Sequence, residues 1–199
     1  MSTAPANPHV NLEKISVLIA DHNLMSLDIT GQALTAFGVR QVHKCESGEQ
    51  ALKAVLGHPF DFIIADANLN GVDGFEFIKL LRRMQNQQTA FIPVVLTMGH
   101  ARPSQVHQAR DSGANFVVAK PITPKVLLER IFWVAREDRP FIETKSYIGP
   151  ERRFKREGPP IGVSGRRKSD LHTELGEATT PNLSQDQISK LMKPMKVIL

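Results

Sequence analysis

The chain has 199 residues, 41% of them apolar, and a formal net charge of +5. Its single cysteine, Cys45, excludes an internal disulfide, and no apolar run approaches the ~20 residues of a membrane-spanning helix. Residues 1–11 lack the apolar core of a signal peptide and are expected to be flexible. We therefore expect a cytoplasmic protein without a transmembrane segment, with one good-sized domain and additional material.

The positive charge is concentrated in the last third of the chain. Residues 1–138 hold 13 basic and 13 acidic residues, whereas residues 139–199 hold 12 basic and 7 acidic ones. This division predicts a neutral globular domain at 12–138, followed by a basic extension. We divide the extension into an Arg-rich segment containing Gly and Pro at 139–182 and a short amphipathic helix at 183–199.

Apolar runs alternate with helical periodicity along the neutral part of the chain. Strands are predicted at 15–20, 39–45, 60–65, 92–96 and 116–119, and helices at 24–37, 47–56, 75–84, 102–112 and 123–136. Five successive strand–helix units predict an α/β fold, a doubly wound, flavodoxin-like sheet of five parallel strands. The basic extension is expected to be irregular.

Four polar side chains fall at the carboxyl ends of predicted strands. Asp21 follows the first strand, Asp66 the third, Thr97 the fourth and Lys120 the fifth. Right-handed crossovers bring these strand ends to one edge of the sheet, where open α/β folds carry their sites. Two acids, a hydroxyl and a lysine at one edge predict a pocket that accepts a phosphoryl group.

The same segments resemble the receiver domain of response regulators of the CheY type. The resemblance covers roughly residues 14–137 and rests on four motifs in the right order, at 17–21, 66–74, 93–97 and 113–121. It implies a phosphorelay protein that is not an enzyme beyond its own phosphorylation. A sensor histidine kinase or phosphotransfer protein would be the donor, and a downstream protein would receive the signal.

The resemblance also implies a role for each residue of the pocket. Asp66 would be the phosphoacceptor, and Asp21 would belong to the acidic pocket. Asn68 would offer its backbone carbonyl to Mg²⁺, while Thr97 and Lys120 would contact the phosphoryl group. Phosphorylation would give Asp66 a charge of about −1.5 to −2, and the new oxygens could draw in Thr97 and Lys120.

Two positions depart from the receiver pattern. His22 stands where receivers commonly place a second acid, and a neutral imidazole suits softer metals better than Mg²⁺. The predicted Mg²⁺ site of Asp21, Asp66 and Asn68 is weakened accordingly, unless His22 simply begins a helix and faces solvent. Val117 stands where a switching Tyr or Phe is common, and Phe116 should point to the other side of its strand.

The extension carries two Arg-Arg pairs, each in a segment with Gly and large apolar residues. Arginine can donate two parallel hydrogen bonds to the O6 and N7 atoms of guanine, and a carboxylate can accept hydrogen bonds from the Watson–Crick edge of guanine. The Arg-x-x-Asp element at 167–170 resembles the one in CheY-like cyclic di-GMP effectors. That resemblance implies a cyclic di-GMP site formed by Tyr147, Arg152, Arg153, Arg166, Arg167 and Asp170.

Two other interpretations of the extension stay open. Residues 145–168 carry eight basic residues against Glu151 and Glu157, a local charge of +6 that could hold nucleic acid in a salt-dependent way. No helix-turn-helix follows the domain, so a DNA-binding regulator is not expected. Alternatively, the extension is a plain linker and the receiver a non-phosphorylated scaffold.

Overall fold

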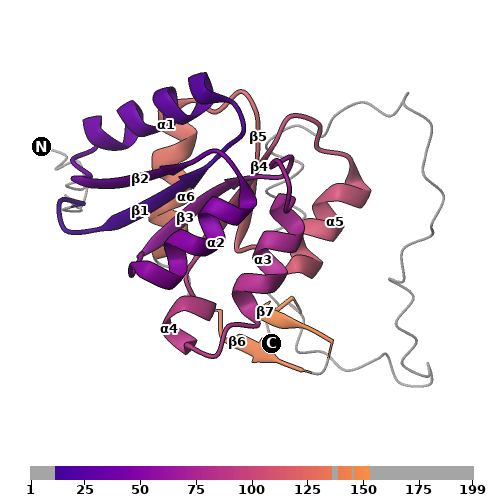
Figure 1. Ribbon diagram of the computed structural model, residues 1–199. Coiled ribbons are helices and arrows are strands. Elements are labelled where there is room, and N and C mark those ends of the chain that lie inside the picture. Colours follow the sequence, from indigo (N-terminus) through magenta and orange to yellow (C-terminus); the bar gives the residue numbers. More distant parts are fainter. Residues whose placement is uncertain (1–11, 136–138, 145, 153–199) are drawn as a thin grey trace, which may run out of the picture.

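The computed structural model describes residues 12–135, 139–144 and 146–152. Figure 1 shows the elements in chain order: β1 (Ser16–Ala20), α1 (Leu24–Ala36), β2 (Gln41–Cys45), α2 (Gly48–Gly57), β3 (Phe62–Asp66), α3 (Gly74–Arg82), α4 (Gln87–Ala90), β4 (Val94–Met98), α5 (Pro103–Ser112), β5 (Phe116–Ala119), α6 (Pro124–Ala135), β6 (Phe141–Glu143) and β7 (Ile148–Pro150). The predicted C-terminal helix and the ligand residues Arg153, Arg166, Arg167 and Asp170 lie outside the described residues.

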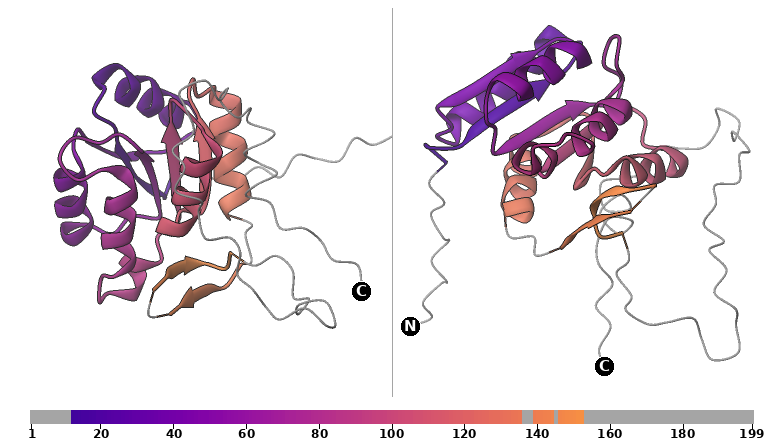
Figure 2. Two further views of the ribbon diagram at one scale, coloured as in Figure 1. Left: turned by 90° about the vertical axis from the view of Figure 1, so that its right-hand side faces the viewer. Right: turned by 60° about the horizontal axis from the view of Figure 1, so that its bottom comes forward.

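The first five strands form one parallel sheet in the order β2-β1-β3-β4-β5. This is the flavodoxin-like order, so the predicted fold class is confirmed. Right-handed crossovers place α1 on one face and α2, α3 and α5 on the other. Figure 2 shows α6 across the sheet from α2 and α3. Both faces of the central strands are therefore covered.

The burial of the strands follows from this layering. Every residue of β3 and β4 is buried, as expected for continuous apolar runs between two layers of helices. The edge strand β2 is largely exposed. Five helices begin after a side chain that accepts a hydrogen bond from a backbone N–H of the first turn: Asn23 for α1, Ser47 for α2, Asp73 for α3, Asn86 for α4 and Thr123 for α6.

The element boundaries differ in detail from those predicted. Strands β3 and β4 begin two residues later than expected, because Phe60 and Ile92 are buried but precede the paired backbone. Apolar character predicts burial of a side chain and not the hydrogen bonding of its backbone. The helix predicted at 75–84 ends at Arg82, and the single turn α4 after it was not predicted.

A β-hairpin replaces the irregular structure expected just after residue 138. Strands β6 and β7 pair antiparallel, with Phe141 opposite Pro150 and Glu143 opposite Ile148. The turn is closed by Tyr147, whose N–H donates to Thr144 Oγ1 at 3.0 Å. Figures 1 and 2 show the hairpin beside α3 and α4.

Side chains of the hairpin segment fasten it to the domain. Tyr147 is 7% exposed, and its hydroxyl donates to the carbonyl of Pro150 at 2.6 Å. The guanidinium of Arg152 lies 3.9 Å from the centre of the Tyr147 ring and 2.5 Å from Asp111 Oδ1 in α5. Arg139 donates to the carbonyl of Asn115 at 2.9 Å. The packed unit thus continues to Arg152, and Tyr147 and Arg152 contact each other within it.

Arg82 is a second fastening point and is 2% exposed. Its Nε donates to the carbonyl of Gly113 at 3.1 Å, and Nη1 donates to the carbonyls of Ala90 and Ile92 at 2.6 and 2.8 Å. The ring of Phe141 in β6 covers the guanidinium at 5.1 Å. Arg82 therefore connects α3 with α4, with the start of β4, with the end of α5 and with the hairpin.

We expect the titration of Tyr147 to report the docking of the hairpin. Burial raises the pKa of Tyr147 to about 12, although nearby arginines oppose the shift. Because the unfolded chain ionises first, the stability contributed by this burial is complete below pH ~10 and is lost as the pH rises toward 12. Tyr147 is the chain's one tyrosine, so ultraviolet absorbance measures it alone. An apparent pKa near 10 in the folded protein would contradict the docked hairpin.

Among the described residues, no helix has the length and apolar character needed to cross a membrane.

Candidate functional site

The four polar residues predicted at strand ends do meet at the carboxyl edge of the sheet. Asp21 directly follows β1, and Lys120 directly follows β5. Asp66 is the last residue of β3 and pairs in register with Thr97 of β4. Asp21, Asp66 and Thr97 are each at most 5% exposed. Charged groups so deeply buried need partners, which the surrounding residues provide.

Lys120 is the cationic partner of both acids. Its Nζ lies 2.7 Å from Asp21 Oδ2 and also forms an ion pair with Asp66 Oδ2. Burial by itself lowers the pKa of Lys120, but the hydrogen bonds and charges of Asp21 and Asp66 outweigh burial and raise it. The ammonium thus stays charged at neutral pH, beside the carboxylate that would receive a phosphoryl group.

Backbone and hydroxyl donors complete the contacts of the two carboxylates. The N–H of Asn68 donates to Asp66 Oδ1 at 2.8 Å, and the N–H of Asn23 donates to Asp21 Oδ1 at 2.9 Å. Thr97 Oγ1 lies 3.2 Å from Asp66 Oδ2. Asn23 was not predicted as part of the site, although its place as the N-cap of α1 is a recognisable signal.

A glycine allows the loop after Asp66 to turn tightly. A Cβ atom on Gly74 would lie 2.2 Å from the backbone oxygen of Asp66, a distance that no side chain can occupy. The N–H of Gly74 donates to the carbonyl of Ala67 at 3.0 Å, and Asp73 caps α3. The Asp73-Gly74 pair therefore sets the start of α3 directly against the end of β3.

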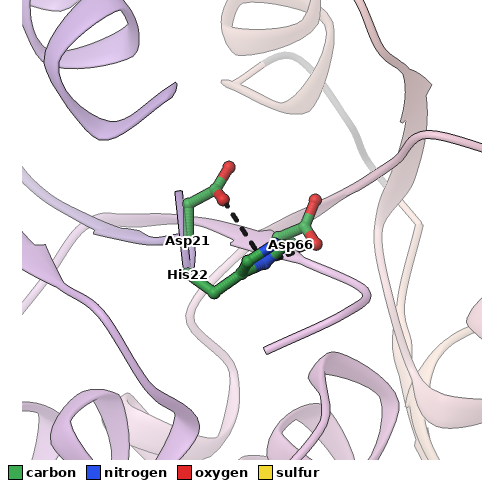
Figure 3. Close-up of side chains that lie close together, drawn as sticks. All are labelled: Asp21, His22 and Asp66. Carbon is green, nitrogen blue, oxygen red and sulfur yellow. Dashed lines mark ion pairs between the residues drawn. The ribbon is translucent and has the colours of Figure 1, made fainter. Parts of the chain in front are cut away.

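His22 points toward the two acids (Figure 3). Its Nδ1 lies 3.8 Å from Asp21 Oδ1 and 3.8 Å from Asp66 Oδ1, and its side chain is 42% exposed. The alternative in which His22 begins a helix is excluded, because Asn23 caps α1 and the helix starts at Leu24. Ligand atoms of Asp21, His22 and Asp66 all lie within 4.8 Å of one another.

The donor set fits Mg²⁺ only in part. Carboxylate oxygens are the ligands that this hard cation prefers, and Asp21 and Asp66 supply them. The imidazole of His22 does not fit, because nitrogen ligands suit softer divalent ions. The pocket therefore matches a Mg²⁺ site in its two carboxylates and departs from one at His22.

The strand next to Lys120 has no aromatic switch on the expected side. Phe116 is fully buried, and its ring packs edge-on against Trp133 of α6 at 4.9 Å. Val117 is also fully buried, and successive residues of a strand point to opposite faces. Phe116 therefore belongs to the face covered by α6, on the other side of the strand from Val117.

A doubly wound sheet with two buried acids and a lysine at its carboxyl edge defines a class of signalling domain. The model of the response regulator receiver domain matches residues 17–132, and the chain belongs to this family. Receiver domains are generally non-enzymatic signalling domains that interact with histidine kinases or phosphotransfer proteins. They bind Mg²⁺ at an acidic pocket, which corresponds here to Asp21 and Asp66.

Similar proteins support the assignment. The probable chemotaxis protein CheY of Rhizobium etli is 33% identical over 123 residues, which are 60% of this chain and 94% of that protein. The signal transduction histidine-protein kinase BarA of Escherichia coli K12 is 32% identical over 108 residues, 54% of this chain but 11% of that protein. The structure of CheY4 of Vibrio cholerae has a TM-score of 0.56 and 28% identity, covering 60% of this chain and 98% of that one.

Proposed function

We propose that the chain is a two-component response regulator whose Asp66 accepts a phosphoryl group from a phosphohistidine. The observation that carries this proposal is the environment of Asp66. It is 2% exposed, paired with Lys120, and in hydrogen-bond contact with Thr97 and with the N–H of Asn68. A carboxylate fixed between a cation and a hydroxyl is arranged for nucleophilic attack on phosphorus and for stabilising the charge that develops there.

The transfer follows from these contacts. A carboxylate oxygen of Asp66 attacks phosphorus, and the bond from phosphorus to the donor imidazole breaks. The bonding electrons return to the imidazole, which takes a proton from solvent, and Asp66 becomes an acyl phosphate. The ammonium of Lys120 stabilises the negative charge on the transferring oxygens. The added charge on Asp66 then attracts Lys120 and Thr97, and their movement would alter the surface near β4 and β5.

Exposed apolar residues of α1 offer a place for the phosphodonor to dock. Leu24, Met25 and Ile29 are 60%, 71% and 54% exposed, and α1 begins three residues after Asp21. Large exposed apolar side chains next to a site favour a protein contact. We infer that a histidine kinase or phosphotransfer protein approaches Asp66 along this helix.

Binding of cyclic di-GMP by the extension stays a prediction. Four of its six predicted residues lie outside the described part of the chain, while Tyr147 and Arg152 pack in the hairpin region. Nucleic-acid binding by the extension, its role as a plain linker and the cytoplasmic location also stay predictions.

Replacing Asp66 with Asn should abolish phosphate incorporation from acetyl phosphate, because an amide is not a nucleophile for phosphorus. Phosphate is measured by the mass of the intact protein, with a series of divalent cations supplied. Asp73→Asn is the matched control, since Asn caps helices as well as Asp does and α3 should keep its N-cap. The proposal would be contradicted if Asp66→Asn and wild type incorporated equal amounts of phosphate. It would also be contradicted if wild type incorporated no phosphate with any of the cations.

A further inference from the structure

We propose that His22 is a metal ligand, and that Asp21, His22 and Asp66 bind a divalent transition-metal ion such as Co²⁺, Ni²⁺ or Zn²⁺ in preference to Mg²⁺. The proposal rests on the proposed function, because that function is what gives this pocket a role. Metal binding itself can be measured on the unphosphorylated protein, without any phosphodonor.

The distances around His22 suit a single bound ion. Its Nδ1 is 3.8 Å from one oxygen of each carboxylate, too long for a hydrogen bond. Bonds from a transition metal to nitrogen or carboxylate oxygen are about 2.0–2.2 Å, so one ion can contact two atoms up to about 4 Å apart. The widest separation within the cluster is under 4.8 Å, and small rotations of the side chains would close it.

The two acids divide their oxygens between two sides of the pocket. Both Oδ2 atoms face the ammonium of Lys120, whereas both Oδ1 atoms face His22. An ion on the His22 side would therefore not displace the lysine. Each Oδ1 also accepts one backbone N–H, from Asn23 or Asn68, and keeps a lone pair for a metal. Such supporting hydrogen bonds orient metal-binding carboxylates and are typical of built metal sites.

The chemistry of the donor set decides which ions it prefers. Mg²⁺ requires oxygen ligands and sheds water reluctantly, so an imidazole adds little to its binding. Imidazole nitrogen is a good ligand for transition metals, whose affinities rise from Mn²⁺ through Co²⁺ to Cu²⁺. Because the His22 side chain is 42% exposed, the open side of the ion would remain accessible to water or to a phosphoryl oxygen.

The test is a Co²⁺ titration of the unphosphorylated protein with two readouts. Visible absorption responds to nitrogen ligands of the ion, and calorimetry gives the affinity. Wild type should bind Co²⁺ at least about tenfold more tightly than Mg²⁺. His22→Ala should lose about 10–100-fold in Co²⁺ affinity with little change for Mg²⁺. His22→Asp should gain Mg²⁺ affinity and lose the spectrum of nitrogen coordination. His58→Ala, at the exposed end of α2, is the matched control and should match wild type.

Two results would overturn the proposal: His22→Ala binding Co²⁺ like wild type with the same spectrum, or wild type preferring Mg²⁺. These failures are distinct from failure of the proposed function. A protein that binds Co²⁺ through His22 but is not phosphorylated with any cation would contradict phosphoacceptance alone. A protein phosphorylated at Asp66 with Mg²⁺, and indifferent to His22→Ala, would contradict the metal proposal alone.

Discussion

Replacing Arg82 with Met should destabilise the domain by about 3–5 kcal/mol, the range expected when the charged partner of a buried polar network is removed. The carbonyls of Ala90, Ile92 and Gly113 lose their donor together, and each buried group that is left unpaired costs about 1–3 kcal/mol. The free energy of unfolding is measured by urea denaturation, with far-ultraviolet circular dichroism as the signal.

The neighbouring arginine provides the matched control for this experiment. Arg83 is exposed, so Arg83→Met should change the stability by no more than about 0.5 kcal/mol. If Arg82→Met were as stable as Arg83→Met, the hydrogen bonds of Arg82 would not hold α3, α4 and α5 together. A loss of stability limited to the hairpin would appear as a lower pKa of Tyr147 and not as global unfolding.

Replacing Lys120 with Met should slow phosphoryl transfer to Asp66 by about 10²–10³-fold, the loss expected when one donor that stabilises developing charge is removed. Lys120 supplies the cation in contact with Asp66, and its pKa is raised by both acids, so it is charged throughout the physiological range. The initial rate of phosphate incorporation from acetyl phosphate, at fixed divalent cation, measures the effect.

Lys125 is the matched control for Lys120, since it is exposed on α6 and carries the same charge. Lys125→Met should phosphorylate at the rate of wild type. In Lys120→Met the acids Asp21 and Asp66 face each other without the ammonium, so divalent cations should stabilise this variant more than they stabilise wild type. A Lys120→Met rate within twofold of wild type would show that the lysine does not act in transfer.

The edge residues could be predicted from sequence because topology alone brings them together. Asp21, Asp66, Thr97 and Lys120 each follow or end an apolar run, and a parallel sheet with right-handed crossovers aligns the ends of its strands. Their identity as acids, hydroxyl and lysine then specified the chemistry. No contact between side chains had to be known in advance.

The hairpin and the burial of Arg82 depend on contacts that local sequence does not specify. Strands β6 and β7 have three residues each, and their docking relies on Tyr147 and on the ion pair of Arg152 with Asp111 in α5. Arg82 follows the apolar residue Ile78 by four positions, a spacing that indicates the buried face of α3. The carbonyls of Ala90, Ile92 and Gly113 that its guanidinium reaches come from other parts of the chain, and only the fold brings them to it.

The orientation of His22 is a further feature that the sequence left open. The sequence allowed His22 either to stand in the metal pocket in place of an acid or to begin a helix and face solvent. The structure distinguishes them because Asn23, and not His22, caps α1, which leaves the imidazole directed toward Asp21 and Asp66. The N-cap signal of Asn23 was present in the sequence, but it did not specify a side-chain direction.

Chemical mapping of the phosphorylated residue shows whether Asp66 is the phosphoacceptor. Borohydride reduces an aspartyl phosphate to homoserine, which peptide mass spectrometry can locate in the chain. After treatment with acetyl phosphate, we expect homoserine at position 66 and at no other aspartate, and none without the phosphodonor. Reduction at Asp21 or Asp73, or a borohydride-resistant phosphate on His22 or Thr97, would contradict it.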